Sequence, residues 1–590
     1  MSEFRIMVTV HGRGEPVRLE YDGKSSLMEA MQKQGVYISA SCGGRGTCGK
    51  CKLQVREGIL EATAWDRTRL SPKELKEGYR LACGAYPKEA CTVSLAEAEE
   101  DEFEVIGGSA DHRYGMPAGE CRQTGKSSGG MQVEDGGMDK LTAENSGYAI
   151  AIDMGTTTLA LRLVRICDNQ VLRTYTAVNR QRAYGADIIT RIKASAEGKQ
   201  ELLRTCIQRD LLEGIRWLTG EAGTEPGTGS GTAPGIEQAF IDNKTLSENK
   251  TEAVSEQVSH ITPGVSGNRI TRIAVAGNTA MGHLLLGYSC ETLGVYPYRP
   301  VDIGRITLPF ADVFAREEFR AKVTLLPGIS AFVGGDIVSG LYSCDFDRRD
   351  KPCLFLDLGT NAEMAIGNKD RIMVTSAAAG PAFEGGNIEY GVGSIPGAIR
   401  GMTIQRNVPI CKTIGDKSPV GICGTGVIEI ASELLKAGLM DETGLLCEEY
   451  FEQGYTVAAD VNGKAIRFTQ KDIRELQLAK AAIRAGIEIL IRRYGTSYEE
   501  LDTVYLAGGF GYRMDIKKAV HMGLLPGELY HKTKAIGNSS LDGATRCLSD
   551  AEADRHMEHI LAVAEELHLS GDEAFNGLYI GFMNFDSQSI

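Results

Sequence analysis

Four cysteines near the N-terminus constrain this chain more than any other feature. Residues 42–51 read CGGRGTCGKC, which separates Cys42, Cys48 and Cys51 by five and two residues, and Cys83 follows in RLACGAYP. Four thiolates suit an iron–sulfur cluster, and the intervening glycines let a loop wrap tightly and aim backbone N–H groups at the sulfurs. We therefore expect these four cysteines to be the metal ligands of a [2Fe–2S] cluster that carries single electrons.

A structural zinc ion is the alternative occupant of this loop. Four-cysteine zinc sites usually bring two C-x-x-C pairs, and residues 42–83 contain only one, which favours the cluster. Cys91 is a competing ligand, although its place in the alternating stretch CTVSL predicts a buried strand residue. The spacing resembles that of adrenodoxin-like ferredoxins over residues 1–95, which implies one-electron transfer at low potential; plant-type clusters lie at about −400 mV.

Charge and composition exclude several classes of partner. A net charge of −14 argues against a nucleic acid or an anionic membrane as partner, because phosphate-rich surfaces need clustered Lys and Arg. The N-terminus MSEFRIMVTV has Glu3 and Arg5 where a signal peptide needs an uninterrupted apolar stretch, and no run of about 18 uncharged apolar residues occurs. We therefore expect a cytoplasmic protein. Fifteen cysteines in 590 residues are too few for a disulfide scaffold, which favours reduced thiols and metal ligands.

The order of segments predicts a multidomain chain of α+β and α/β folds. Residues 1–96 have the pattern of a β-grasp ferredoxin domain, with a strand pair, a helix, the cysteine loop, and a short helix that starts at Ser71-Pro72. Residues 97–147 are acidic and glycine-rich and are expected to form a flexible linker. Residues 148–590 alternate strands and helices in a two-lobed domain, with a polar insertion at about 219–268.

Three glycine turns, each after an apolar strand, indicate a nucleotide site. They lie in YAIAIDMGTTT, LFLDLGTNAE and TVYLAGGFG. In such turns glycine lets N–H groups approach a phosphate, hydroxyls bond to its oxygens, and an aspartate holds a hydrated Mg²⁺ or orients a water. We therefore expect Asp153 and Asp357 to be the catalytic residues. The expected nucleotide-binding residues are Gly155, Thr156, Thr157, Gly359, Thr360, Asn361, Gly508, Gly509 and Phe510.

Further glycine-rich turns stand between a strand and an expected helix. Helix N-termini at such turns could bind anions, or the turns could serve packing alone. They lie at residues 277–279, 334–336, 380–382, 424–426 and 537–539.

The three turns occur in the order typical of a known superfamily. They resemble the phosphate and adenosine motifs of actin, sugar kinases and heat-shock chaperone ATPases, in which two related subdomains close on ATP. The resemblance implies ATP with Mg²⁺ as cofactor. A structural relic that has lost the nucleotide is the alternative.

The whole chain resembles the reductive activators of corrinoid-dependent enzymes. The resemblance rests on the order of ferredoxin, linker and ATPase-like domain, and on the strings AIDMGTTT, DLGTNAE, SAAAGPAFEGG, GICGTGVIE and YLAGGFG. It implies ATP-dependent reduction of Co(II) to Co(I) in a corrinoid protein of a methyltransferase system. It also suggests a homodimer, and it leaves the low-potential electron donor to the cluster unidentified.

Other functions remain open from the sequence. One is an ATP-driven electron carrier for a different low-potential enzyme, and another is a small-molecule kinase with a redox module. A third is a ferredoxin fused to a nucleotide-free scaffold that docks a partner.

Overall fold

The computed structural model describes residues 4–10, 17–21, 23–34, 36–38, 40, 42–95, 147–220, 269–461 and 463–585. The expected linker therefore lies outside the described residues except for Gly147, and so does the expected polar insertion except for Thr219 and Gly220. The chain divides into two compact units. The first contains the described parts of residues 1–102, 180–186 and 215–267, and the second contains the remainder. Each unit is described separately.

The N-terminal unit is built on a five-stranded sheet in the order β2-β1-β5-β3-β4. The first strand pairs antiparallel with the second, as the sequence predicts, and parallel with the fifth. Helix α1, Leu27–Lys33, buries Leu27, Met28 and Met31 in the core of this unit. The strands are β1 Phe4–Val10, β2 Val17–Tyr21, β3 Lys52–Glu57, β4 Tyr79–Leu81 and β5 Thr92–Leu95.

Short helices flank the cysteine loop, and their ends follow from local capping. Helix α3, Pro72–Lys76, begins after Ser71, whose hydroxyl accepts from the Glu74 N–H while the Glu74 carboxylate accepts from the Ser71 N–H. This capping box confirms the predicted helix start. Helix α2, Ala64–Arg69, begins with the same device at Thr63, and the 3₁₀ helix η1, Ala82–Gly84, carries the fourth cysteine.

The second unit contains two six-stranded sheets that use the same hairpin device. The first sheet has the order β10-β11-β9-β6-β7-β8, and β6 pairs antiparallel with β7 and parallel with β9. Strands β6 and β7 are buried along most of their length, and their sequences are therefore mostly apolar. The strands are β6 Tyr148–Met154, β7 Thr158–Arg165, β8 Gln170–Val178, β9 Ile270–Gly277, β10 Ile306–Pro309 and β11 Lys322–Leu325.

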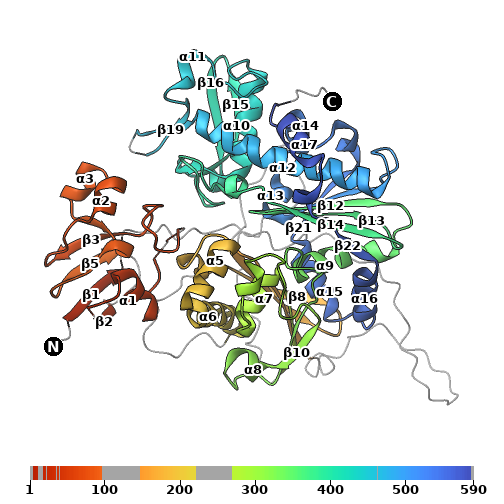
Figure 1. The fold of residues 1–590 in the computed structure, drawn as a ribbon, viewed down its shortest axis with the longest axis horizontal. Coiled ribbons are helices and arrows are strands. Elements are labelled where there is room, and N and C mark those ends of the chain that lie inside the picture. The colour runs from red at the N-terminus through yellow and green to blue at the C-terminus, as the bar shows by residue number, and fades with distance from the viewer. Residues whose placement is uncertain are drawn as a thin grey trace, which may run out of the picture. The chain divides into compact units, whose positions relative to one another are not determined.

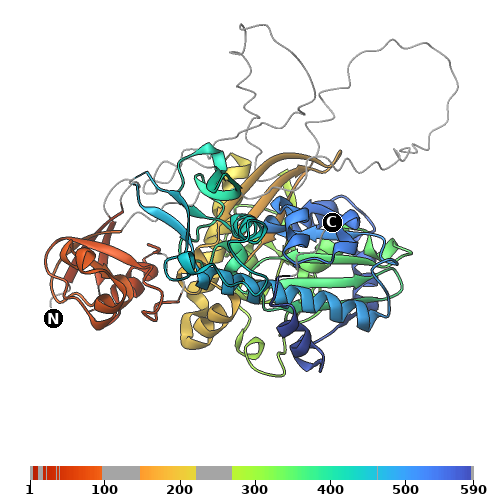
Figure 2. The same ribbon diagram turned by 90° about the horizontal axis from the view of Figure 1, so that it is seen from above.

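The second sheet has the order β21-β20-β12-β13-β14-β22. Strand β12 pairs antiparallel with β13 and parallel with β20, which repeats the arrangement around β6. The long helix α12, Gln470–Tyr494, lies along β13 and β14 of this sheet (Figures 1 and 2). The strands are β12 Cys353–Leu358, β13 Ala362–Gly367, β14 Ile372–Ala377, β20 Val504–Ala507, β21 Thr533–Gly537 and β22 Ala564–Glu566.

Two helices join the sheets through a shared apolar core. Helix α9, Gly335–Ser343, packs on α15, Ser539–Cys547, and α15 also contacts β6 and β9. One cluster of buried residues contains side chains from β6, β9, β12 and β20 together with both helices. The N-termini of α9 and α15 contribute to the site described below.

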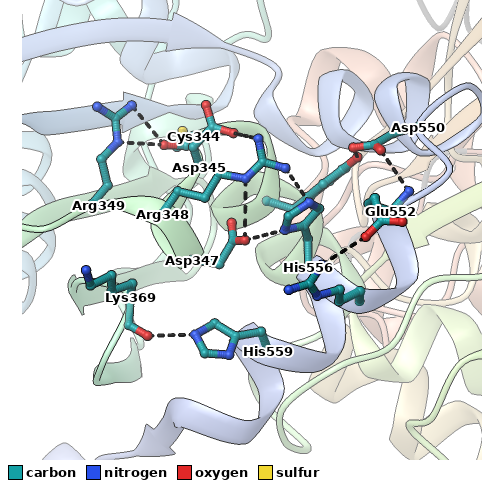
Figure 3. A network of polar contacts seen from close by, with 12 residues as sticks. Cys344, Asp345, Asp347, Arg348, Arg349, Lys369, Asp550, Glu552, His556 and His559 are labelled. Atoms are coloured by element: carbon teal, nitrogen blue, oxygen red, sulfur yellow. Dashed lines mark hydrogen bonds and ion pairs between the residues drawn. The ribbon is translucent and has the colours of Figure 1, made fainter.

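A polar network ties the far end of α9 to helix α16, Ala553–Val563 (Figure 3). His556 on α16 donates through Nδ1 to the Asp347 carboxylate at 2.5 Å, and its Nε2 accepts from Arg348. Asp347 is buried, so this pairing satisfies a carboxylate that would be costly to leave alone. His559, one turn further along α16, contacts the Lys369 carbonyl at 2.7 Å.

A smaller subdomain completes the second unit. The hairpin of β15, Ala398–Gln405, and β16, Val408–Thr413, joins β17, Gly421–Ile422, in a three-stranded sheet packed on helix α10, Gly424–Lys436. The other elements of the chain are α5 Ile188–Ala194, α6 Gln200–Thr219, α7 Thr279–Leu286, α8 Phe310–Phe314, α11 Glu448–Phe451, β18 Tyr455–Ala459, β19 Ala465–Phe468, α13 Gly508–Arg513, α14 Ile516–His521 and α17 Phe575–Gly581. The expected mixed, multidomain fold class is confirmed. Within the described ranges, no helix is long and apolar enough to cross a membrane.

Candidate metal centre and phosphate-binding cleft

The four predicted cysteine ligands come together as two pairs. The Cys51 and Cys83 sulfurs lie 3.3 Å apart, where the start of β3 meets η1. Cys42 forms its own hydrogen bond with Cys48 inside the loop. Cys48 is partly exposed, and the other three are buried.

Local hydrogen bonding favours thiolates in this loop. Burial raises the pKa of Cys42, but hydrogen bonds from Cys48 and Thr47 outweigh burial and bring this pKa down to about 6. The hydrogen bond from Cys83 lowers the pKa of Cys51, and the same bond together with burial raises the pKa of Cys83. The thiolate is the form that binds metal, and these hydrogen bonds favour it at Cys42 and Cys51 and oppose it at Cys83.

Two loop glycines are required by close approach and by backbone conformation. Gly46 has φ +74°, and a Cβ there would lie 2.3 Å from the Trp65 ring. Gly44 has φ +89°, and a Cβ there would lie 2.5 Å from the Met28 methyl carbon. At Gly46 a larger residue would collide with the Trp65 ring, whereas at Gly44 the flexible Met28 side chain can move and the positive φ is the constraint.

The donor set fits a two-iron cluster better than a single zinc ion. A [2Fe–2S] cluster takes four cysteines, and two thiol pairs offer two ligands to each iron. Cys91 is buried beside Gly58 just before β5, as the sequence predicts, and burial raises its pKa.

The first phosphate turn joins β6 to β7, with Asp153 near the end of β6. Its carboxylate accepts from the Asn538 amide and the Ser540 hydroxyl, each at 2.8 Å. Both partners lie at the N-terminus of α15, so the helix start fixes the direction of the carboxylate. Burial raises the pKa of Asp153, and these two hydrogen bonds partly oppose that shift.

The second phosphate turn and the expected adenosine turn lie side by side. Asp357 is in register with Ala507 because β12 pairs parallel with β20. The next residue, Gly508, has φ +86°, and a Cβ there would lie 2.7 Å from the Asp357 Oδ1. Glycine is therefore needed at position 508 for both its conformation and its contact.

Two further carboxylates complete the cleft, and the sequence analysis did not assign them. Asp336 lies in the first turn of α9, and Glu363 lies on β13, six residues after Asp357. Burial and the neighbouring charge of Asp153 raise the pKa of Asp336 to about 7. Burial and the charges of Asp336 and Asp153 likewise raise the pKa of Asp357 to about 7, and burial with Asp336 and Asp357 raises that of Glu363.

Such mutual repulsion is what a bound cation would relieve. Carboxylate oxygens with retained waters are the ligands that Mg²⁺ prefers, usually beside phosphate oxygens. Asp153, Asp336, Asp357 and Glu363 therefore form an acidic cluster that would attract a divalent cation. Within the described residues no three of these side chains are placed to ligate one ion directly, so the cation would be held through its waters. Each side chain is only partly buried, which leaves room for water and a ligand to reach it.

A fifth acidic residue, Glu384, connects the two phosphate turns. The Thr157 hydroxyl of the first turn donates to the Glu384 carboxylate at 3.0 Å. On its other side, the carboxylate lies 3.6 Å from the Cβ position of Gly359 in the second turn. Glu384 thus places negative charge between the two turns, in the region where phosphate oxygens are expected. Only its place in SAAAGPAFEGG hinted at a role.

The remaining predicted residues divide into turn formers and packing residues. The Gly155 carbonyl accepts from Asn179 at 2.9 Å, and the Thr156 hydroxyl accepts from Asn278 at 3.0 Å. The Phe510 ring is buried and stacks on Phe383 at 4.5 Å, so it supports the third turn through packing. In the second turn, the Gly359 N–H donates to the Asn361 carbonyl, and the Thr360 carbonyl accepts from Gly380. A Cβ at Gly509 would meet open space.

Comparisons with protein families agree with this division of the chain. The C-terminal domain of RACo, described as the ASKHA domain, matches residues 351–590, and the RACo middle region matches residues 148–228 and 238–349. A 2Fe-2S iron-sulfur cluster binding domain matches residues 9–88. The two RACo matches meet near residue 350, within the single domain that the sequence predicts for residues 148–590.

Individual relatives and one solved structure extend the likeness. The chain is 29% identical over 453 residues to the corrinoid activation enzyme RamQ of Eubacterium limosum, covering 73% of this chain and 69% of the relative. It is 31% identical over 359 residues to the [Co(II) methylated amine-specific corrinoid protein] reductase of Methanosarcina barkeri, covering 55% of this chain and 64% of the relative. A solved reductive activator for a corrinoid, iron-sulfur protein is 26% identical, with a TM-score of 0.63, and the match covers 99% of this chain and 98% of that one.

The fold and both sites define an iron–sulfur activator that combines a [2Fe–2S] domain with an ATPase domain of the actin and chaperone kind. More particularly, the chain belongs to the RACo family. Its cofactors are a [2Fe–2S] cluster and ATP.

Proposed function

We propose that this chain passes one electron from its [2Fe–2S] cluster to the cobalt of a corrinoid protein, converting Co(II) to Co(I), with ATP bound in the carboxylate cleft. The observation that carries the proposal is the presence in one chain of two thiol pairs and a cleft of four partly buried carboxylates. The names of the relatives, a corrinoid activation enzyme and a Co(II) corrinoid protein reductase, support cobalt as the acceptor.

The assignment of residues follows from the geometry above. Cys42, Cys48, Cys51 and Cys83 hold the cluster, because they supply two buried or partly buried thiol pairs. The cluster supplies one-electron chemistry at low potential. The glycine turns place cysteine N–H groups near the sulfurs and thereby adjust that potential.

In the cleft, each group has a separate task. Asp153 and Asp357, with Asp336 and Glu363, hold the hydrated Mg²⁺ of the nucleotide. Gly155, Thr156 and Thr157 from the first turn, and Gly359, Thr360 and Asn361 from the second, bind phosphate oxygens through N–H, hydroxyl and amide groups. The turn of Gly508, Gly509 and Phe510 borders the adenosine.

Nucleotide is needed because the electron transfer is uphill. A corrinoid Co(II) is reduced only at very low potential, and a cluster near about −400 mV loses a factor of ten in equilibrium for each 59 mV of deficit. Binding energy can offset this deficit only if nucleotide favours one state of the complex over another. Closure of the two turns around phosphate provides such a difference in affinity.

The corrinoid protein belongs to a methyltransferase system in this proposal, and a separate low-potential donor recharges the cluster. A homodimer and a cytoplasmic location stay predictions of the sequence.

The test is anaerobic. Reduced protein is mixed with a Co(II) corrinoid protein, and the cobalt visible absorption is followed with and without MgATP. We expect Co(I) only with MgATP, and none with an Asp357→Asn variant that keeps its cluster spectrum. Equal Co(I) formation without nucleotide would remove the role of the cleft, and no Co(I) with several corrinoid proteins would favour another low-potential acceptor.

A further inference from the structure

A cavity lies in the C-terminal half of the chain, in the smaller subdomain. It has a volume of about 420 Å³ and is bounded by the β15–β16 hairpin, α10, and the segment of α13 and α14. Sites for small molecules typically measure about 300–1,000 Å³. No residue that lines it belongs to the carboxylate cluster or to the three glycine turns, so it is separate from the nucleotide cleft.

Cationic side chains dominate the lining of this cavity. Arg400, Lys412, Arg513 and Lys518 face two acidic residues, Glu429 and Asp515. The excess of positive charge is notable in a chain whose net charge is −14. The cavity is thus a local reversal of the charge of the whole protein.

Both acidic residues are already engaged. Glu429 forms an ion pair with Lys518 at 2.5 Å, and Lys518 also lies 3.5 Å from Glu433. Asp515 caps α14, accepting from the N–H groups of Lys517 and Lys518 at 2.9 and 3.3 Å. The Glu429 charge is therefore offset by Lys518, whereas Asp515 keeps its charge and leaves the four cations of the lining in excess by two.

Arg400 and Lys412 are the cations left over. They lie on the paired strands β15 and β16, where Lys412 is in register with Gly401, the neighbour of Arg400. Both side chains are exposed. Within the described part of the chain, neither side chain makes a hydrogen bond or an ion pair. A Cβ at Gly401 would lie 3.6 Å from the Glu429 Oε2 and 3.7 Å from the Lys412 Cβ, so the Glu429 carboxylate that pairs with Lys518 also borders this part of the cavity.

We propose that this cavity binds a small dianion, a phosphate monoester or a dicarboxylate, between Arg400 and Lys412. Arginine offers a planar fork that matches carboxylate and phosphate geometry, and lysine adds a point charge. The Thr425 hydroxyl, in the first turn of α10, lines the same cavity and can donate to a bound oxygen. The inference is independent of the proposed reductase function, because it uses none of the residues assigned to that function.

The experiment is isothermal titration calorimetry on the full-length, cluster-loaded protein at low ionic strength. Inorganic phosphate and malonate are the two probes, and the tighter probe identifies the class of ligand. The test variant is R400Q/K412Q. The control is R406Q/K417Q, which removes the same charge from the same region at two positions outside the cavity lining. An intact cluster spectrum and an unchanged Tm report that each variant is folded.

We expect the test variant to weaken binding of the preferred probe about tenfold or more, because two charge-assisted contacts are lost. The control variant should leave the affinity unchanged, and R400K/K412Q should bind the probe more tightly than R400Q/K412Q because one positive charge is restored. Equal weakening in the test and control variants would indicate general charge attraction and overturn the proposal. Loss of phosphate binding in Asp357→Asn alone would place the anion in the nucleotide cleft and also overturn it.

Discussion

Replacement of Glu384 by glutamine tests how the two phosphate turns are held without nucleotide. The Glu384 carboxylate accepts from the Thr157 hydroxyl at 3.0 Å and lies beside Gly359, so it fills the region that phosphate oxygens must enter. A hydrogen bond to a charged group contributes about 1.5–3 kcal/mol, and the partial exposure of Glu384 favours the lower end. Glutamine can still accept from Thr157, but a neutral hydrogen bond contributes about 1 kcal/mol less than a charged one. About 1 kcal/mol corresponds to about fivefold in affinity, so Glu384→Gln should bind MgADP about fivefold more tightly.

The assay is anaerobic calorimetric titration of MgADP into the full chain. Glu389→Gln is the matched control, because this exposed carboxylate lies five residues away and the residue contacts Asp472 through its backbone N–H, which the substitution keeps. The control should bind MgADP like the unaltered protein. A tenfold loss of affinity in Glu384→Gln would refute the reasoning, since it would make this carboxylate a holder of the Mg²⁺ and not a competitor of phosphate.

Three other predictions concern the cluster, the third turn and stability. Cys48→Ser should abolish the visible absorption of the [2Fe–2S] cluster, whereas Cys91→Ala should retain it, as measured by anaerobic spectroscopy. The opposite pattern would make Cys91, and not Cys48, the cluster ligand. Gly508→Ala should abolish ATP-dependent turnover with the cluster spectrum intact, because the added Cβ meets a carboxylate and a carbonyl within 3 Å. Asp542→Ala should cost about 3 kcal/mol of unfolding free energy in denaturant titrations, because it removes the carboxylate that lies 2.7 Å from the buried Arg162 guanidinium and leaves that charge uncompensated by its ion pair. The double variant with Arg162→Met should regain most of that loss, and no regain would mean that the pair is not the cause.

The sequence predicted best what local chemistry determines. The capping box at Ser71 and Glu74 uses residues three apart, so the short helix could be read directly. The cysteine loop is also local, apart from Cys83. The cysteines and glycines of residues 42–51 lie close together in the sequence, and this pattern was enough to predict a cluster-binding loop. The phosphate turns at Asp153 and Asp357 each lie in a hairpin between neighbouring strands, which is again a local pattern.

What the sequence could not predict is assembled by distant pairing. Asp336 reaches the cleft because α9 packs on α15, whose N-terminus holds Asp153 through Asn538 and Ser540. The turn at residues 334–336, a candidate for anion binding in the sequence, contributes the Asp336 carboxylate. The turn at residues 537–539, another such candidate, orients the Asp153 carboxylate through Asn538. Glu384 is 227 residues from its partner Thr157, a separation that no local pattern reveals.

The central claim is that the electron delivered to cobalt comes from the cluster of this chain and requires ATP. The most direct measurement is an anaerobic single turnover: chain whose cluster is reduced, freed of excess reductant, is mixed with a Co(II) corrinoid protein, and cluster reoxidation and Co(I) formation are followed together. The account predicts that both signals change in a one-to-one ratio, and only when MgATP is present. Co(I) formation while the cluster stays reduced, or the same yield without MgATP, would contradict it.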